Sequence, residues 1–214
     1  MKNKLILIGG GGHCRSCIDV IESEGKFKIV GIIDIKEKIG ENVLGYNIIG
    51  CDEDLPYLLK NYKNFFISIG QISSPEIRLV IFEKLKENGA ELPIIISPFS
   101  HVSKHAKLGN GTIIMHGAVV NAGSRIGQNC IINTGAVIEH DTIIGDHCHI
   151  STNSIINGGS KIGESTFIGS GCVLKEYIEI NRGVIIGAGS VVLNSITESG
   201  IFYGKPVKRQ ESNG

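Results

Sequence analysis

Aliphatic residues recur at every sixth position over the second half of the chain. Beginning at Val102, sixteen consecutive positions of this spacing carry Val, Leu or Ile without one insertion. They are Val102, Leu108, Ile114, Val120, Ile126, Ile132, Ile138, Ile144, Ile150, Ile156, Ile162, Ile168, Leu174, Ile180, Ile186 and Val192. The residue four places after each is mostly small, and glycine often follows the aliphatic residue directly. Such a period is typical of a solenoid built from six-residue units.

Each unit is expected to form one short strand and one tight turn, so that three units complete a triangular coil of eighteen residues. The aliphatic side chain points inward, and the small residue fits where the chain bends. Glycine, Asn and Asp supply turn conformations that other residues resist. From 102 to 191 there are 90 residues, and 90/18 predicts five coils. Stacked coils bury a continuous core that no single unit could bury, so the pattern predicts a parallel β-helix.

Residues 1–97 have a different pattern, in which apolar runs alternate with segments of helical spacing. The expected strands are Leu5–Ile8, Phe27–Asp34, Phe65–Ile69 and Leu92–Ile96, and the expected helices are His13–Glu24, Asp52–Asn61 and Ser74–Asn88. This alternation favours a small parallel sheet of the Rossmann-like α/β class. The β-helix domain is expected at 98–192. Residues 193–214 are expected to form a C-terminal tail with a turn at Gly204-Lys205-Pro206.

Composition narrows the function classes. The 21 Lys and Arg residues balance 21 Asp and Glu residues, which disfavours a nucleic-acid-binding protein because such proteins normally carry a basic excess. The longest apolar runs are far too short to span a bilayer, and the N-terminus has the pattern of a strand rather than a signal peptide. The six cysteines are therefore expected to be free thiols in a reducing cytoplasm.

A glycine run, Gly9 to Gly12, lies between the first strand and the first helix and is followed by His13. Backbone amides at such a turn can approach a diphosphate, and a helix N-terminus favours negative charge. A dinucleotide fingerprint beginning at Gly9 would require glycine at position 14, where Cys14 stands. The run therefore disfavours NAD and favours a sugar-nucleotide site, with a plain tight turn as the alternative.

Two further residues end strands on the same side of the predicted sheet. Asp34 ends the second strand, where an acid often meets a ribose or sugar hydroxyl, or it is a solvated loop residue. Gly70 follows the third strand, where it either lets a ligand approach closely or simply turns the chain.

The cysteines offer little chemistry. Cys14 and Cys17 form a CxxC pair in one helical turn, but a metal site needs a second ligand pair that this domain does not supply. A redox pair is the less favoured alternative. Cys130, Cys148 and Cys172 occupy the small position of the repeat and are expected in the core.

His140 lies at the turn of its hexad within Glu139-His140-Asp141. The flanking carboxylates can orient the ring and stabilise its protonated form. One coil before and one coil after it stand Ala122 and Gly158, because 140−18=122 and 140+18=158. These small neighbours leave room for a ligand. His140 is therefore either a catalytic base or a surface turn histidine.

His149 ends the following hexad, half a coil from His140. The two positions are on different parts of the prism, so they are not expected to meet within one chain. They could meet across the cleft between two neighbouring prisms, which favours a site between copies if both are functional. Zinc at such an interface would need two histidines with four residues between them and a third ligand, and the sequence contains no such pair.

Three segments, taken together, identify a family. They are Gly9-Gly10-Gly11-Gly12-His13, then Phe66-Ile67-Ser68-Ile69-Gly70 followed by Arg78, and Asn133-Thr134-Gly135-Ala136-Val137-Ile138-Glu139-His140-Asp141. With the unbroken hexapeptide array, they resemble the sugar O- and N-acetyltransferases of the NeuD/PglD family, which contain a left-handed β-helix. The resemblance covers nearly the whole chain, including Gly204-Lys205-Pro206-Val207-Lys208.

The resemblance implies a homotrimer with acetyl-CoA in the groove between adjacent β-helices, and a nucleotide-sugar bound by the N-terminal domain, 1–97. No metal is expected. It implies that His140 is the catalytic base and Asp141 the acid beside it. The residues that it places at the acetyl-CoA site are Asn133, His149, Gly158, Ser170 and Ala188. Those that it places on the nucleotide-sugar side are Gly11, Gly12, His13, Asp34 and Gly70.

The preferred hypothesis is an acetyl-CoA-dependent N-acetyltransferase acting on a UDP-linked 4-amino-deoxy sugar, with His140 as general base. Transfer is expected to be direct, because no cysteine lies beside His140 in the hexad frame. One alternative is O-acetylation of a sialic-acid-type sugar by the same machinery. The other is a non-catalytic nucleotide-sugar-binding trimer, against which the flanks of His140 argue.

Overall fold

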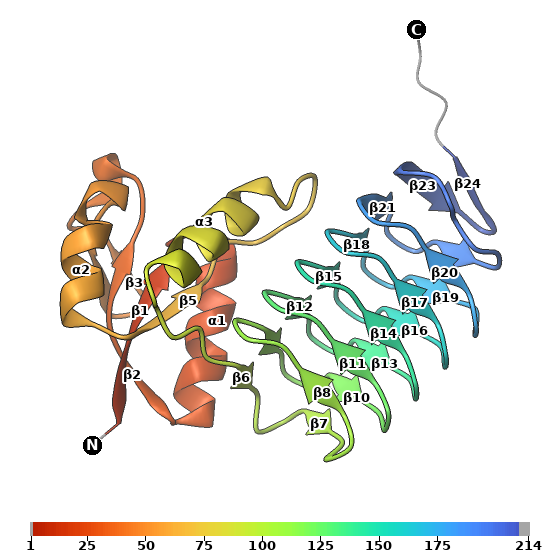
Figure 1. Cartoon of the computed structure of the whole chain (residues 1–214), viewed down its shortest axis with the longest axis horizontal. Helices are drawn as coiled ribbons and strands as arrows, with labels where there is room; N and C mark the ends of the chain where they lie inside the picture. Colours follow the sequence, from red (N-terminus) through yellow and green to blue (C-terminus); the bar gives the residue numbers. More distant parts are fainter. Residues whose placement is uncertain (1, 210–214) are drawn as a thin grey trace, which may run out of the picture.

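The computed structural model describes residues 2–209, and its first part is an α/β domain (Figure 1). The elements are β1 (Asn3–Ile8), α1 (Gly12–Glu24), β2 (Phe27–Ile33), the 3-10 turn η1 (Lys36–Lys38), β3 (Asn42–Val43), β4 (Tyr46–Gly50), the 3-10 turn η2 (Asp52–Asp54), α2 (Leu55–Asn61), β5 (Asn64–Ile67) and α3 (Glu76–Glu87). The sheet order is β3-β4-β2-β1-β5, and β4, β2, β1 and β5 run parallel. The parallel sheet and the three helices expected from the sequence are confirmed.

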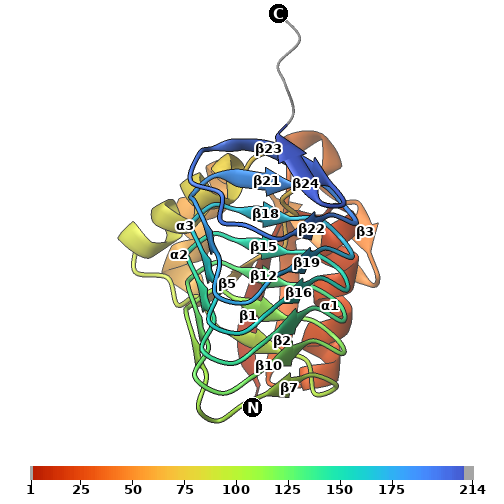
Figure 2. The ribbon, with the colours of Figure 1, turned by 90° about the vertical axis from the view of Figure 1, so that its right-hand side faces the viewer.

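The second part is a three-sided prism (Figures 1 and 2). Each side is a sheet whose strands run parallel, except for the last strand, β24. One sheet contains β6 (Ile95–Ile96), β9 (Ile113–Ile114), β12 (Ile131–Ile132), β15 (His149–Ile150), β18 (Phe167–Ile168), β21 (Val184–Ile186), β23 (Gly200–Gly204) and β24 (Val207–Arg209). The next contains β7 (His101–Val102), β10 (Val119–Val120), β13 (Val137–Ile138), β16 (Ile155–Ile156), β19 (Val173–Leu174) and β22 (Val191–Val192). The last contains β8 (Lys107–Leu108), β11 (Arg125–Ile126), β14 (Ile143–Ile144), β17 (Lys161–Ile162) and β20 (Glu179–Ile180). Strands β7 to β21 make the five predicted coils of a left-handed β-helix.

Strand β6 corrects one expectation. We expected Leu92–Ile96 in the N-terminal sheet, but Ile95 and Ile96 pair with Ile113 and Ile114 of β9. Ile96 lies six residues before Val102, so it is the first member of the aliphatic series. The solenoid therefore begins one unit earlier than the sequence pattern was taken to begin.

The β3–β4 hairpin was not expected. Its strands join at Leu44 and Gly45, which have φ of 49° and 92°. A left-handed backbone is uncommon for leucine, so Leu44 gives no turn signal in the sequence.

The C-terminal segment also differs from the expected tail. Strand β23 adds to β21 in parallel, and β24 returns antiparallel to β23. The predicted turn at Lys205 and Pro206 joins them and is confirmed. The last residues assigned to the tail, 210–214, lie outside the described part of the chain.

The outer surfaces of the three sheets differ in chemistry. The sheet that begins with β6, here called the docked face, is covered at its start by the N-terminal domain, because Ile113 and Ile131 share a buried cluster with α1. The sheet that begins with β7, the apolar face, presents a half-buried aliphatic row: Val119, Val137, Ile155, Val173 and Val191. The sheet that begins with β8, the charged face, presents an exposed row: Lys107, Arg125, Ile143, Lys161 and Glu179.

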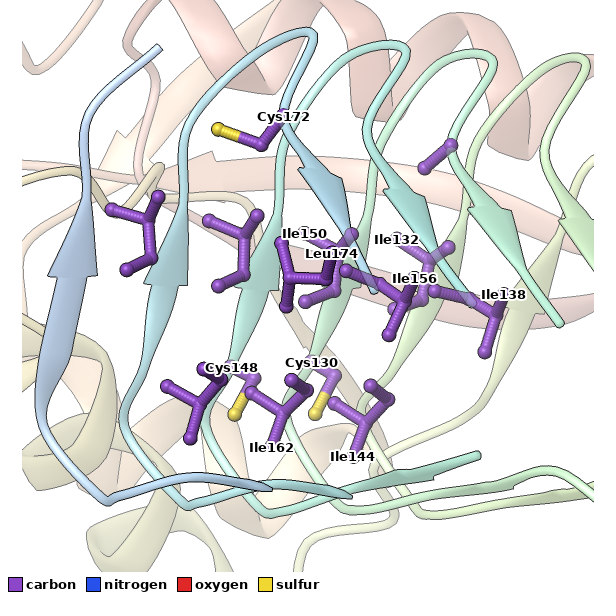
Figure 3. Packing of buried hydrophobic residues seen from close by; sticks show 14 of the residues in the cluster. Cys130, Ile132, Ile138, Ile144, Cys148, Ile150, Ile156, Ile162, Cys172 and Leu174 are labelled. Atoms are coloured by element: carbon purple, nitrogen blue, oxygen red, sulfur yellow. The ribbon is translucent and has the colours of Figure 1, made fainter. Parts of the chain in front are cut away.

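Inside the prism the aliphatic series forms one continuous buried cluster (Figure 3). The small residues are more than space fillers, because their hydroxyl or thiol groups donate to the carbonyl fifteen residues later. Examples are Thr112 to Gly127, Ser154 to Gly169 and Cys148 to Gly163, with donor–acceptor distances of 2.8, 2.7 and 3.1 Å. Where the small residue is Ser, Thr or Cys, these bonds tie the corner to the next coil, and cysteine replaces serine or threonine in them.

The glycines of the repeat serve two purposes. The residue three places after the aliphatic residue has a positive φ, as at Gly135 (67°) and Asn153 (55°). The glycine directly after the aliphatic residue is needed for close stacking instead, since a Cβ at Gly145 would lie 2.6 Å from the amide nitrogen of Glu164. No helix among residues 2–209 is long and apolar enough to cross a membrane.

Candidate active site

His140 lies just after β13, at the corner between the apolar face and the charged face. Its side chain is 57% exposed, and Nδ1 is 3.0 Å from Oδ2 of Asp141. Because a carboxylate only accepts, Nδ1 carries the hydrogen of this bond and neutral His140 keeps its lone pair on Nε2. Nε2 lies directly over Gly158, where a Cβ would be only 2.6 Å away. The predicted stacking of His140 on Gly158 is confirmed, and the glycine is required for this ring position.

The backbone around His140 is held by both neighbouring coils. The amide of Asp141 donates to the carbonyl of Ala122 (3.1 Å), and the amide of Gly159 donates to the carbonyl of His140 (2.9 Å). Asp141 has a φ of 58°, and its carboxylate folds over Gly123 in the preceding coil. The His140–Asp141 pair is therefore exposed in its side chains but fixed in its backbone.

Glu139 does not flank the ring as the sequence suggested. Its Oε2 accepts from Nδ2 of Asn121 at 2.9 Å, one coil earlier. Of the two carboxylates expected to orient His140, only Asp141 is bonded to it.

His149 has the opposite environment, on the docked face. Its Nδ1 is hydrogen-bonded to the carbonyl of Gln71, and its Nε2 lies 3.0 Å from Nδ2 of Asn133. The carbonyl can only accept, so Nδ1 carries the hydrogen and Nε2 accepts from Asn133. Burial lowers the pKa of His149 to about 4. His149 is thus a neutral ring of fixed tautomer with both nitrogens bonded.

His13 and Gly70 lie together at the carboxyl end of the N-terminal sheet. A Cβ at Gly70 would be 3.4 Å from Cβ of His13. Burial, with nearby Arg78 and His149, lowers the pKa of His13 to about 3. Its Nε2 is buried and has no hydrogen-bond partner within residues 2–209. The ring therefore offers an unused polar atom at the place where the two domains meet.

The glycine run opens onto free space. A Cβ at Gly11 or Gly12 would meet nothing within 4 Å. Helix α1 begins at Gly12, and the first amides of a helix have no intrahelical acceptor. This end of α1 can therefore receive an anionic group at Gly11, Gly12 and His13.

Asp34 has a role that neither sequence interpretation included. Its carboxylate accepts from the amides of Gly10 (2.6 Å) and Ile35 (2.7 Å) and from Lys38 (3.2 Å). Burial alone would raise the pKa of Asp34, but these hydrogen bonds outweigh it and lower the pKa. Asp34 is therefore an ionised anchor for the glycine turn.

The other predicted acetyl-CoA residues separate into two groups. Ser170 and Ala188 lie, with Asn133, at the corner between the docked face and the apolar face, where Ser170 Oγ is 2.9 Å from Ser151 Oγ. Gly158 lies at the other corner, with His140. The full width of the apolar face separates the two groups, so one chain does not bring all the predicted residues together.

All six cysteines are buried free thiols. Burial raises the pKa of Cys14 and of Cys17, which disfavours a reactive thiolate at the CxxC pair. Cys130, Cys148 and Cys172 lie in the solenoid core, as expected (Figure 3). Within the described residues, no group of three or more His, Cys, Asp or Glu side chains could hold a metal ion.

Sequence reasoning missed the residues that hold His149. Gln71 acts through its backbone carbonyl, which no sequence motif reveals. Arg78 was noted only as part of a family pattern, yet it is 1% exposed and spans the two domains. A buried arginine has no sequence signal, because arginine is usually a surface residue.

Comparisons with known proteins find relatives over nearly the whole chain. The model of the PglD N-terminal domain matches residues 4–85, and the bacterial transferase hexapeptide model (six repeats) matches 123–158 and 159–194. PerB from Caulobacter crescentus, solved with CoA and GDP-perosamine, is 33% identical, with 98% of each chain covered and a TM-score of 0.91. A histidine-to-asparagine variant of perosamine N-acetyltransferase from Caulobacter crescentus, solved with the same ligands, is 32% identical, with 98% of each chain covered and a TM-score of 0.92.

The acetyltransferase domain of PglB from Neisseria gonorrhoeae, solved with acetyl coenzyme A, is 30% identical, with 98% of this chain and 100% of that chain covered and a TM-score of 0.91. No curated protein sequence gives a significant match.

Proposed function

Because the chain belongs to the PglD-type family of hexapeptide-repeat sugar acetyltransferases, we propose that it acetylates the 4-amino group of a UDP-linked deoxy sugar with His140 as general base. The observation that carries the proposal is the exposed His140 ring, whose Nδ1 is bonded to Asp141 and whose Nε2 is left for a ligand. The pair has the geometry of a base and its orienting acid. Because the chain belongs to a family of enzymes, the alternative of a non-catalytic trimer is not retained.

In the proposed reaction, the acceptor amine attacks the thioester carbonyl of acetyl-CoA while Nε2 of His140 takes a proton from the nitrogen. Asp141 holds Nδ1–H and stabilises the imidazolium that forms. The tetrahedral intermediate collapses as the carbon–sulfur bond breaks, and His140 returns the proton to the CoA thiolate. Direct transfer is supported by the burial of all six cysteines, which leaves no thiol to carry the acetyl group.

The complete site is proposed to form between copies of the chain. The apolar face presents its aliphatic row outward, whereas the docked face is covered by the N-terminal domain and the charged face presents mostly charged side chains. Packing through the apolar face would bring the His140 corner of one copy toward the Asn133 corner of another. Such a contact joins two different edges of the prism, and contacts of this kind form a ring when the rotation between copies closes; we propose that it closes after three copies, as a trimer. Acetyl-CoA would lie in the resulting groove, along Asn133, Ser170 and Ala188.

The N-terminal domain is proposed to hold the acceptor. The amides at the start of α1, at Gly11, Gly12 and His13, suit a diphosphate. The sugar is proposed to lie beside them, near His13 and Gly70, where Gly70 adds no side chain. A GDP-linked amino sugar is the second candidate, since PerB, 33% identical, was solved with GDP-perosamine. N-acetylation is preferred to O-acetylation of a sialic-acid-type sugar because the perosamine relative is named as an N-acetyltransferase.

The test is to incubate the protein with acetyl-CoA and a panel of UDP- and GDP-linked 4-amino sugars, CMP-sialic acid and free sialic acid, and to follow CoA release. Turnover of a nucleotide-linked amino sugar that disappears in His140→Asn supports the proposal. Turnover of sialic acid alone, or equal turnover by His140→Asn, contradicts it.

A further inference from the structure

A buried guanidinium links the two domains. Arg78, on α3, is 1% exposed. Its Nη1 donates to the carbonyls of Ile67 (3.0 Å) and Ile69 (2.6 Å) in the N-terminal domain. Its Nη2 donates to the carbonyl and the side-chain oxygen of Asn129 in the solenoid, at 3.0 and 2.6 Å. All four acceptors are neutral, so the charge is balanced by oriented carbonyl and amide groups instead of a carboxylate.

The N-terminal end of this link carries the residues of the candidate site. Ile67 ends β5, and the chain continues through Ile69 to Gly70 and Gln71. Gly70 lies against His13, and the carbonyl of Gln71 accepts from Nδ1 of His149. A shift of this short segment would therefore disturb the acceptor side and His149 together.

The solenoid end of the link is equally fixed. Asn129 is a corner residue with a φ of 52°, and its Nδ2 lies 3.0 Å from Nδ1 of His147, one coil later. The carbonyl of His147 in turn accepts from Nε2 of Gln71 at 2.9 Å. Arg78, Asn129, His147 and Gln71 thus close a ring of contacts between the domains, directly beside His149.

We propose that Arg78 is a positioning residue for acetyl transfer, which sets the end of β5 against the solenoid so that acceptor and acetyl group meet in register. The proposal rests on the proposed function in placing the acceptor at His13 and Gly70. Arginine suits the task because its planar fork reaches carbonyls in both domains at once, whereas lysine offers a single nitrogen. Misplacement of a substrate by about 1 Å can lower a rate by about 100-fold.

The test compares Arg78→Lys and Asn129→Gly with Glu24→Ala as control. Glycine keeps the left-handed backbone of position 129 but removes the side-chain contacts to Arg78 and His147. Glu24 also links the domains, since its Oε1 accepts from the amide of Ile96 at 3.1 Å, but it does so at β6, the first strand of the docked face. Loss of Glu24 therefore weakens the domain junction without touching the segment from Ile67 to Gln71.

For Arg78→Lys we expect kcat/KM to fall by about 10- to 100-fold for the amino sugar nucleotide turned over fastest in the panel. We also expect the pKa of His149, followed by NMR, to rise from about 4 toward the ordinary histidine value as water enters. Asn129→Gly should change both readouts in the same direction by less. Glu24→Ala should lower the melting temperature while leaving both readouts at wild-type values.

The proposal is overturned if Arg78→Lys and Asn129→Gly only lower the melting temperature, as Glu24→Ala does. If no acceptor is turned over by the wild type, the proposed function fails while the NMR readout still decides whether Arg78 positions His149. If one of the two variants, Arg78→Lys or Asn129→Gly, does not fold, the other tests the proposal.

Discussion

His140 and His149 are nine residues apart in the sequence and differ in almost every physical respect. The side chain of His140 is 57% exposed, and its Nε2 has no hydrogen-bond partner within residues 2–209. His149 is 6% exposed, and both of its nitrogens are bonded within the protein. This difference indicates that His140, and not His149, can exchange a proton with a ligand. In the proposed mechanism His140 is the base, and His149 holds Asn133 in place.

The largest effect on activity is expected when the base is removed. His140→Asn is expected to lower kcat by about 10²- to 10⁴-fold, the usual contribution of a positioned base. Asparagine keeps a polar side chain but cannot take up the proton. Oligomeric state and CoA binding should remain, because an exposed corner residue contributes little to the core. Steady-state kinetics and equilibrium binding of CoA check this, and wild-type kcat in the variant would make His140 a surface histidine.

The burial of His149 should make the stability of the protein depend on pH. The pKa of His149 in the folded protein, about 4, is below its ordinary value of 6.5. Its contribution to the free energy of unfolding is therefore present above pH 6.5 and is lost as the pH falls from 6.5 through 4. The loss is at most about 3.5 kcal/mol, since one pKa unit corresponds to about 1.4 kcal/mol.

Urea unfolding at fixed protein concentration, between pH 4 and pH 7, measures this loss. His149→Gln is the matched control, because glutamine does not titrate and should reduce the pH dependence by one proton. An identical pH dependence in wild type and His149→Gln would mean that His149 is not held neutral by burial.

The position of the His140 ring depends on Gly158. Gly158→Ala should lower kcat by about 10-fold while the fold survives, because the new methyl group displaces the exposed His140 ring from its place beside Asp141. A double-mutant cycle provides the control. In the His140→Asn background the same change should have no further effect on kcat, whereas additive losses would show that Gly158 acts through another contact.

The smallest effect is expected on the acceptor side. Gly11→Leu should raise the KM for the amino sugar nucleotide several-fold and leave the KM for acetyl-CoA unchanged. The backbone φ of −76° at Gly11 suits any residue, and the space above it is empty, so the fold should tolerate leucine. A selective rise in the KM for acetyl-CoA would place the wrong ligand on the N-terminal domain.

The sequence predicted the solenoid well because each aliphatic residue repeats the same physical requirement. Ile138, Ile156 and Leu174 fill the same interior column, and a single spacing identifies them all. Strands β1, β2 and β5 of the N-terminal sheet were also predicted, because their apolar runs are bounded by glycine and polar residues, whereas β3 and β4 were not. The pairing of β6 was predicted wrongly, because its two isoleucines would suit a strand of either domain and only the distant partner β9 decides between them.

The candidate site was predictable only in part. His140, Asp141 and Gly158 are brought together by the eighteen-residue coil, so arithmetic on the sequence places them. The bonds of Asp34 to the backbone amides of Gly10 and Ile35 could not be predicted, because no sequence motif marks them, and its place on the nucleotide-sugar side stays a prediction. The burial of His149 depends on how the N-terminal domain docks, and no local pattern encodes that contact.

The central claim is that a complete site takes His140 from one copy and His149 from another. The most direct test unfolds and refolds together His140→Asn and His149→Asn, and the second variant is also expected to lose activity because it removes the bond from Nε2 of His149 that holds Asn133. If the two histidines of a site come from different chains, random mixing leaves both intact in about one quarter of sites, because ½ × ½ = ¼, and activity should return to about a quarter of wild type. Activity no greater than the average of the two parent variants would contradict the account and place the whole site within one chain.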